Sequence, residues 1–157
     1  MSAIIYICNK IEPLFSKACE YGIRAAIYIA GQSAQKRKVG LKEVAKEIDS
    51  PEAYTSKILQ KLAKGGVVVS EKGPRGGFSI EQGKLQGLKL AVVVNAIDGD
   101  AIYKGCGLGL EECNASKPCP LHFKFKIVRD NLQDLLEKSS LIELSSQLDK
   151  GLGFLKQ

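Results

Sequence analysis

A glycine- and proline-rich turn constrains the fold of this chain more than any other sequence feature. The turn, EKGPRGG, separates a β-branched run, VVVS at 67–70, from a second short run, FSI at 78–80. β-branched and aromatic residues favour strands, whereas proline and glycine favour a turn between them. The sequence therefore predicts a short β-hairpin over residues 67–80.

Three segments with the apolar spacing of amphipathic helices precede this hairpin. They cover residues 16–34, 41–48 and 51–64, and Ser16 is expected to cap the first of them. For the third, we expect Asp49 or Ser50 to act as the cap, Pro51 to occupy the first helical position, and Gly65-Gly66 to end the helix. Two helices joined by a turn and followed by a hairpin form a winged helix-turn-helix, which places its second helix in the major groove of DNA.

The excess of positive charge lies in the same part of the chain. Residues 14–80 contain 12 Lys and Arg against 6 Asp and Glu, whereas residues 81–157 contain ten of each. The formal net charge of +6 therefore resides in the predicted winged helix. This distribution favours a polyanionic partner such as double-stranded DNA, with a solvated lysine-rich surface as the alternative.

Length and composition are those of an ordinary globular chain, with 157 residues, 45% apolar and 25% charged. No apolar run approaches the roughly 18 residues that a membrane span requires. The first residues lack a basic leader and a small-residue cleavage site, so we expect no signal peptide and a cytoplasmic location. In that compartment, clustered cysteines are more often metal-binding or reactive than disulfide-bonded.

The second half of the chain is predicted to be helix, loop and helix. Residues 85–100 predict a short apolar helix, 101–121 a loop, 122–138 a long helix, and 140–151 a last short helix with a capping box of Ser140 and Glu143. One stripe of the long helix is apolar and comprises Phe125, Val128, Leu132, Leu135 and Leu136. We expect this stripe to form a symmetric homodimer interface, with packing on the chain's own winged helix as the alternative.

These elements predict a mostly α (α+β) fold, a winged helix-turn-helix with a C-terminal long dimerisation helix. The expected divisions are an N-terminal extension at 1–13, a DNA-binding winged helix at 14–81, and a cysteine loop with dimerisation helices at 82–157.

The loop holds three cysteines and the only histidine of the chain, with the spacing Cys106-x6-Cys113-x5-Cys119-x2-His122. The gaps are too wide for a zinc knuckle or ribbon. Iron–sulfur clusters bind thiolates and accept an occasional histidine, and these four residues match the four ligands that a two-iron cluster needs. We therefore favour a 2Fe–2S cluster and keep 4Fe–4S as a possibility, with His122 ligating as a neutral imidazole at a helix start.

Three other interpretations of this loop remain open. A structural Cys3His zinc site fits the number of ligands but not their spacing. A thiol switch, in which two cysteines pair on oxidation, needs no metal. A catalytic pair of Cys119 and His122 lacks an orienting partner and an oxyanion site, so the chain is not expected to be an enzyme.

Several stretches taken together resemble the IscR/NsrR-type family of bacterial winged-helix transcriptional regulators. They are FSKACEYGIRAAIYIA, SPEAYTSKILQKLAKGGVV, KGPRGGFSI and the loop end CPLH, and the resemblance covers roughly residues 14 to 150. It implies a homodimer that presents two recognition helices and wings to a symmetric operator. It also implies a cluster whose loss, oxidation or nitrosylation changes the affinity for DNA.

The resemblance implies Cys106, Cys113 and Cys119 as thiolate ligands, with the fourth ligand contested between His122 and Glu20 of the partner subunit. Within the same family, a regulator without a cluster that senses thiol oxidation or a small ligand is the alternative.

Two features depart from the family pattern. Residues 1–13 are additional, and Ser56 stands where the best-known members carry a base-reading glutamate, which leaves the operator sequence open. Neither Cys8 nor Cys19 is a family ligand, and we expect Cys19 to pack within its helix.

The polar side chains of the predicted recognition helix and wing are the expected DNA contacts. Gln60 and Ser56 are candidates for base edges, and Lys57 and Lys61 for phosphates. Arg75 at the wing tip is expected to enter the minor groove. The full set of candidate DNA-binding residues is Tyr54, Thr55, Ser56, Lys57, Gln60, Lys61 and Arg75.

Overall fold

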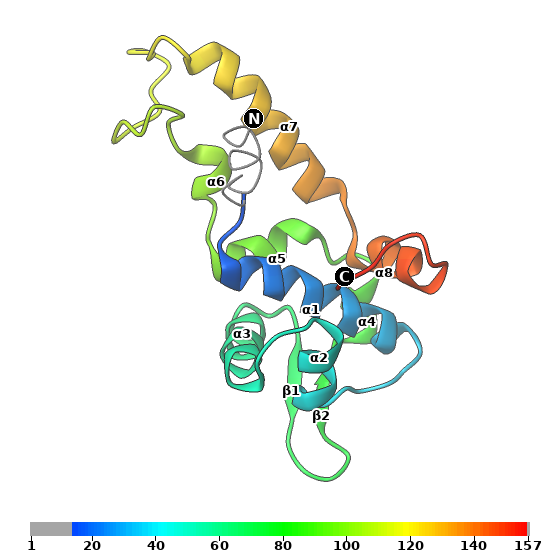
Figure 1. Ribbon diagram of the computed structural model, residues 1–157. Helices are drawn as coiled ribbons and strands as arrows, with labels where there is room; N and C mark the ends of the chain where they lie inside the picture. The colour runs from blue at the N-terminus through cyan, green and yellow to red at the C-terminus, as the bar shows by residue number, and fades with distance from the viewer. Residues whose placement is uncertain (1–13, 157) are drawn as a thin grey trace, which may run out of the picture.

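The computed structural model describes residues 14–156 as a set of helices with one small hairpin (Figure 1). The elements in chain order are α1 (Lys17–Ala34), α2 (Leu41–Glu47), α3 (Glu52–Lys64), β1 (Val69–Glu71), β2 (Gly77–Ser79), α4 (Gln82–Leu85), α5 (Leu90–Ile97), α6 (Ala101–Lys104), α7 (His122–Lys138) and α8 (Leu141–Asp149). The mostly helical class with a two-stranded sheet is confirmed. None of the described helices is both long and apolar enough to cross a membrane.

Helices α2 and α3 and the hairpin form the winged helix. Strands β1 and β2 pair antiparallel, with Ser70 opposite Phe78. Phe78 also exchanges two backbone hydrogen bonds with Val39, at 2.8 and 3.0 Å, so the segment before α2 borders the hairpin. Val67 and Val68, expected in the first strand, are instead buried beneath it. The chain turns back at once after α3, since the Val67 N–H donates to the Leu62 carbonyl at 2.9 Å.

The start of α3 differs from the predicted cap. Pro51 is itself the N-cap residue, and no side chain caps the helix. The expectation for Asp49 and Ser50 was wrong because both residues complete the turn that ends α2. Asp49 has a positive φ of 51°, and the Ser50 N–H donates to the Ala45 carbonyl at 3.0 Å.

Helix α1 lies at the centre of the core and contacts α3, α5 and α8. Its Ser16 cap is confirmed, because the Ser16 hydroxyl accepts from the Cys19 N–H at 3.1 Å. Gly22 allows α5 to pack closely on α1, since a Cβ there would lie 2.0 Å from the Ile97 Cδ1. The largest fully buried side chains are Ile29, Ile48, Ile58, Leu59, Leu62, Leu136 and Leu141.

Residues 85–100 form the end of α4 and all of α5 rather than one helix. The chain between them is held extended, because Leu88 accepts from the Leu141 N–H at 3.0 Å and the Leu90 N–H donates to Ser139 at 2.9 Å. These bonds attach the start of α5 to the turn between α7 and α8. The capping box at the start of α8 is present, with the Ser140 hydroxyl accepting from the Glu143 N–H at 3.2 Å.

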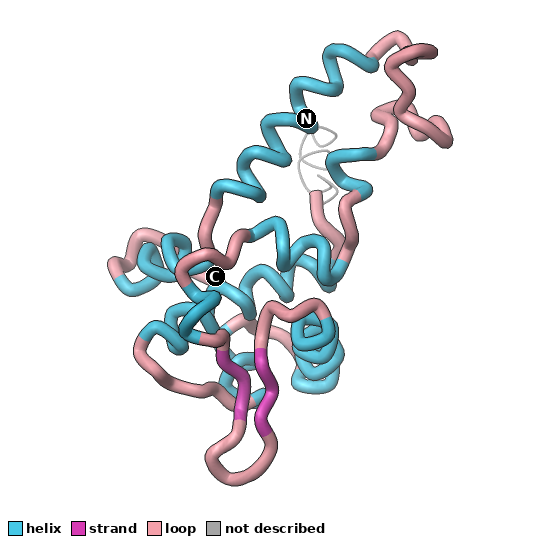
Figure 2. Tube along the Cα trace, turned by 180° about the vertical axis from the view of Figure 1, so that it is seen from behind, coloured by secondary structure: helices cyan, strands magenta, loops and turns pink. Residues whose placement is uncertain are grey.

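Helix α7 has the predicted bounds and extends away from α1, α2 and α3, on the side opposite the hairpin (Figures 1 and 2). Part of its apolar stripe packs within the chain, where Leu136 is buried, Leu132 is half-buried and the Phe125 ring lies against Gly107. Val128 and Leu135 remain 58% and 54% exposed. Packing on the chain's own helices therefore accounts for part of the stripe and leaves the rest uncovered.

Candidate functional site

Helix α3 presents a polar face opposite its buried side. Lys57, Gln60 and Lys61 are exposed and Ser56 is half-buried, whereas the buried side consists of Thr55, Ile58, Leu59 and Leu62. Neither lysine has an acidic partner within ion-pairing distance among the described residues. This face can therefore approach an anionic groove without breaking an ion pair.

One of the seven candidate DNA contacts, Thr55, is placed differently from the expectation, whereas Tyr54 is half-buried. Thr55 is fully buried and its hydroxyl donates to the Pro51 carbonyl at 3.0 Å. Placing Thr55 on the polar face was therefore wrong, because it occupies the same helical stripe as Ile58 and Leu62. Tyr54 packs its ring edge-on against Tyr21 of α1, with 5.7 Å between the ring centroids and an interplanar angle of 84°.

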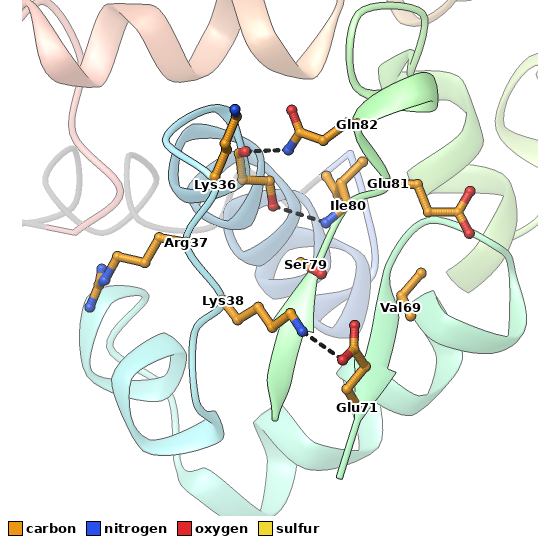
Figure 3. A pocket seen from close by; sticks show the side chains of 10 residues that line it. Lys36, Arg37, Lys38, Val69, Glu71, Ser79, Ile80, Glu81 and Gln82 are labelled. Carbon is orange, nitrogen blue, oxygen red and sulfur yellow. Dashed lines mark hydrogen bonds and ion pairs between the residues drawn. The ribbon is translucent and has the colours of Figure 1, made fainter. Parts of the chain in front are cut away.

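The wing consists of an exposed turn and the closely packed ends of β1 and β2 that carry it. Arg75 lies in the exposed stretch of residues 70–75. At the base, a Cβ on Gly76 would lie 2.1 Å from the Glu71 carbonyl oxygen, so the two backbones approach too closely for any side chain. Figure 3 shows Lys38, which precedes α2, pairing with Glu71 of β1 at 2.6 Å.

A cavity of about 470 Å³ lies beside this base, between the end of α1 and the hairpin (Figure 3). It is framed by two hydrogen bonds to Ser33: the Ile80 N–H donates to its hydroxyl at 2.9 Å and the Gln82 amide to its carbonyl at 2.6 Å. Lys36, Arg37 and Lys38 line the cavity next to the wing, where Arg37 pairs with Glu43 and Lys38 with Glu71. This basic run was not among the expected DNA contacts.

The loop at 105–121 brings the four candidate metal ligands together as two pairs. The Cys106 and Cys119 sulfurs are 3.9 Å apart, and the Cys113 sulfur lies 3.3 Å from the His122 Nδ1. The three thiols are half-buried in an otherwise exposed loop, whereas His122, the first residue of α7, is only 6% exposed.

Hydrogen-bond donors lie next to two of the three sulfurs, Cys106 and Cys113. The backbone N–H groups of Leu108 and Leu110 are directed at Cys106 and lower the pKa of its thiol below the ordinary value. Arg129 of α7, only 7% exposed, donates from Nη1 to the Cys113 sulfur at 2.8 Å. Arg129 was not identified from the sequence. Its position two helical turns after His122 places both residues on the same side of α7, and this spacing could have indicated it.

The donor set fits an iron–sulfur cluster. Three thiols and one imidazole are the number and kind of ligands that a two-iron cluster takes, and they lie as two pairs. Within residues 14–156, however, no three His, Cys, Asp or Glu side chains are gathered closely enough to hold a single metal ion. Glu20 lies in the first turn of α1, where its carboxylate pairs with Lys17 at 2.9 Å.

Cys19 is a packed core residue, as expected. Its side chain is fully buried in α1, and burial together with the nearby Asp98 carboxylate raises the pKa of the thiol from its ordinary 9.0 to about 12. Cys8 and the rest of the predicted extension at 1–13 lie outside the described residues.

Because the Cys19 thiol is buried, we expect its contribution to the stability of the fold to fall at alkaline pH. The unfolded chain releases this proton near pH 9 and the folded chain near pH 12, so the stabilisation is complete below pH 9 and is lost as the pH rises toward 12. We expect the difference in unfolding free energy between wild type and Cys19→Ala to shrink by about 1 kcal/mol between pH 7.5 and pH 10. Urea unfolding at the two pH values measures it, and an unchanged difference would contradict a buried, protonated thiol.

Comparisons with known proteins agree on one family. The sequence model of Rrf2, described as an iron-dependent transcriptional regulator, matches residues 15–147. A putative HTH-type transcriptional regulator of Aquifex aeolicus is 32% identical over 88% of this chain and 96% of its own length. The regulator IscR of Pectobacterium atrosepticum is 26% identical over 79% of this chain and 74% of its own. The solved structure of T. potens IscR has the same fold, with a TM-score of 0.68 at 18% identity over 88% of this chain and 90% of that one.

Proposed function

The chain belongs to the Rrf2 family of iron-dependent transcriptional regulators, and on that premise we propose that it binds operator DNA as a homodimer under the control of an iron–sulfur cluster. The family consists of transcriptional regulators rather than enzymes. In this proposal residues 14–81 bind DNA, and residues 82–157 hold the cluster and form the dimer.

The observation that carries the proposal is the arrangement of the loop at 105–122. Three thiols and one imidazole lie in two close pairs, beside N–H groups and a buried guanidinium. Such donors stabilise thiolate sulfur and tune the potential of a cluster. Cys106, Cys113 and Cys119 would hold the cluster, with His122 or Glu20 of the partner subunit as the fourth ligand. When bound, the cluster supplies a redox-active group that is sensitive to oxidants and nitric oxide.

Packed elements connect the loop to the DNA-binding part. The loop connects the end of α6 to the start of α7. Helix α6 packs on α7, α7 packs on α5, and α5 packs on α3. At the end of α5, the Asp98 carboxylate accepts from the Ser16 N–H at 2.9 Å and from the Ser16 hydroxyl, which fixes the start of α1. A change in the loop can therefore alter the placement of α3. Coupling between sites is typically about 1–3 kcal/mol, or roughly 5- to 150-fold in affinity.

Thiol sensing without a metal is the second candidate, and the Cys106–Cys119 pair favours it. With 3.9 Å between the sulfurs, a small approach closes a disulfide. Two thiols then lose two electrons and two protons to an oxidant such as a low-molecular-weight disulfide, which is reduced to two thiols. The lowered pKa of Cys106 favours its thiolate as the attacking group.

An absorption spectrum with iron and zinc analysis on protein purified without oxygen separates these possibilities. Visible charge-transfer bands and iron in excess over zinc would support the cluster. A colourless protein with bound zinc would make the loop a structural site. A colourless, metal-free protein that binds DNA only when its thiols are reduced would favour the Cys106–Cys119 switch.

On the DNA side, we expect Arg75→Ala to weaken operator binding about tenfold, or about 1.4 kcal/mol. The exposed guanidinium at the wing tip is placed to contact the minor groove or its phosphates. Fluorescence anisotropy at fixed salt, on an operator selected from random DNA by the wild-type protein, measures the change. Lys150→Ala removes one exposed positive charge from the end of α8 and should have little effect. Equal affinity of Arg75→Ala and wild type would remove the wing from the DNA interface.

A further inference from the structure

We infer that Arg129 is a positioning residue, which locks the cysteine loop onto α7 and places a fixed positive charge beside its sulfur ligands. The first role concerns the metal-free chain itself, whereas the second rests on the proposed cluster.

The geometry of Arg129 shows how one side chain joins two distant points of the loop. Its Nη1 donates to the Gly105 carbonyl at 2.5 Å and to the Cys113 sulfur at 2.8 Å. Gly105 is the first residue after α6 and Cys113 lies in the middle of the loop. Both points are thereby attached to the helix that begins with His122. Arg129 thus holds the loop in the position that places the Cys113 thiol beside the His122 imidazole.

The burial and charge of Arg129 support a role beyond packing. The residue is 7% exposed, and among residues 14–156 no carboxylate lies within ion-pairing distance of its guanidinium. A buried cation without a counter-ion is costly unless an electron-rich partner compensates it. Here the partners are a carbonyl oxygen and the Cys113 sulfur, which belongs to the candidate cluster ligands.

In the proposed cluster, a fixed positive charge next to the Cys113 sulfur would change the reduction potential. Reduction adds one negative charge, which a neighbouring cation stabilises, so the charge raises the midpoint potential. Lysine keeps the charge, but its ammonium is one bond closer to the backbone than Nη1 and its N–H groups rotate freely. It therefore loses the reach and the fixed directions with which Nη1 of Arg129 contacts both acceptors. Charge and attachment can therefore be separated by substitution.

The test uses the full chain with Arg129→Met and Arg129→Lys. Lys126→Met on the same helix is the matched control, since Lys126 is exposed and pairs only with Asp130 at 2.5 Å. In the reduced, metal-free protein, hydrogen exchange is followed at Gly109, whose N–H donates to the Cys106 carbonyl at 3.0 Å. We expect roughly tenfold faster exchange at Gly109 in both Arg129 variants and no change in the control.

The second measurement is the midpoint potential of protein reconstituted with iron and sulfide without oxygen. We expect a more negative potential for Arg129→Met and a value near wild type for Arg129→Lys and Lys126→Met. Wild-type exchange at Gly109 in both Arg129 variants would overturn the positioning role. A wild-type potential in Arg129→Met would overturn the charge role. If the wild type itself takes up no cluster, the proposed function fails, whereas the exchange measurement still decides whether Arg129 positions the loop.

Discussion

Replacing Val128 and Leu135 with aspartate is expected to convert the protein to a monomer and to lower operator affinity by roughly 10²- to 10⁴-fold, the range that two linked binding events contribute. Both side chains are more than half exposed on the outer side of α7, where a second copy of the helix would bury them. Burying a carboxylate in such an interface carries a desolvation cost that apolar contacts there do not offset. Analytical ultracentrifugation gives the oligomeric state, and anisotropy with the selected operator gives the affinity.

The matched control is the double variant Lys126→Gln and Lys150→Gln. It changes the net charge by the same amount at two exposed positions, one on the opposite side of α7 from Val128 and one just after α8. We expect it to remain a dimer and to bind DNA with near wild-type affinity. If the Val128 and Leu135 variant still sediments as a dimer, the subunits associate through another surface.

Cys113→Ala is expected to abolish stable cluster binding and to shift operator affinity by roughly 5- to 150-fold, without unfolding the chain. Its sulfur is close to both His122 and Arg129, so its loss removes one candidate ligand and the partner of a buried cation. The fold should survive because Cys113 is half-buried in an exposed loop, outside the core around α1. Iron content, circular dichroism and operator affinity, all measured without oxygen, check these three statements.

Cys19→Ala makes the same chemical change in the core and should leave the iron content unaltered. This control separates loss of a ligand from a general effect of losing a thiol. Identical operator affinities for wild type and Cys113→Ala would indicate a metal site that stabilises the loop and carries no signal.

The features that the sequence predicted correctly depend on neighbours along the chain. The Ser16 cap, the Gly65-Gly66 end of α3 and the bounds of α7 follow from short-range hydrogen bonding and helical periodicity. Thr55 was misplaced for a related reason. Its polarity suggested the exposed face, but its position three and seven residues before Ile58 and Leu62 places it on the buried stripe.

Features that depend on contacts between distant segments could not be predicted from local signals. Asp98 holds the start of α1 across 82 residues, and Arg129 contacts Gly105 across 24. The split of residues 85–100 into two helices likewise arises from pairing with the turn at 139–141. The roles of the loop cysteines and of the α3 side chains remain predictions, since they depend on a cluster, a partner subunit and DNA.

The way α7 is attached gives it the mechanics of a lever. Its C-terminal end is held by the buried Leu136, by the Lys89 ammonium on the Lys138 carbonyl and by the bond from Leu90 to Ser139, whereas the cysteine loop is at the other end. At about 1.5 Å per residue, 17 residues make an arm of about 25 Å. A displacement of about 2 Å at the tip then corresponds to a rotation of about 5° at the pivot. A displacement of the loop would thus reach α5, the helix that packs on α3, as a small rotation of the attached end of α7.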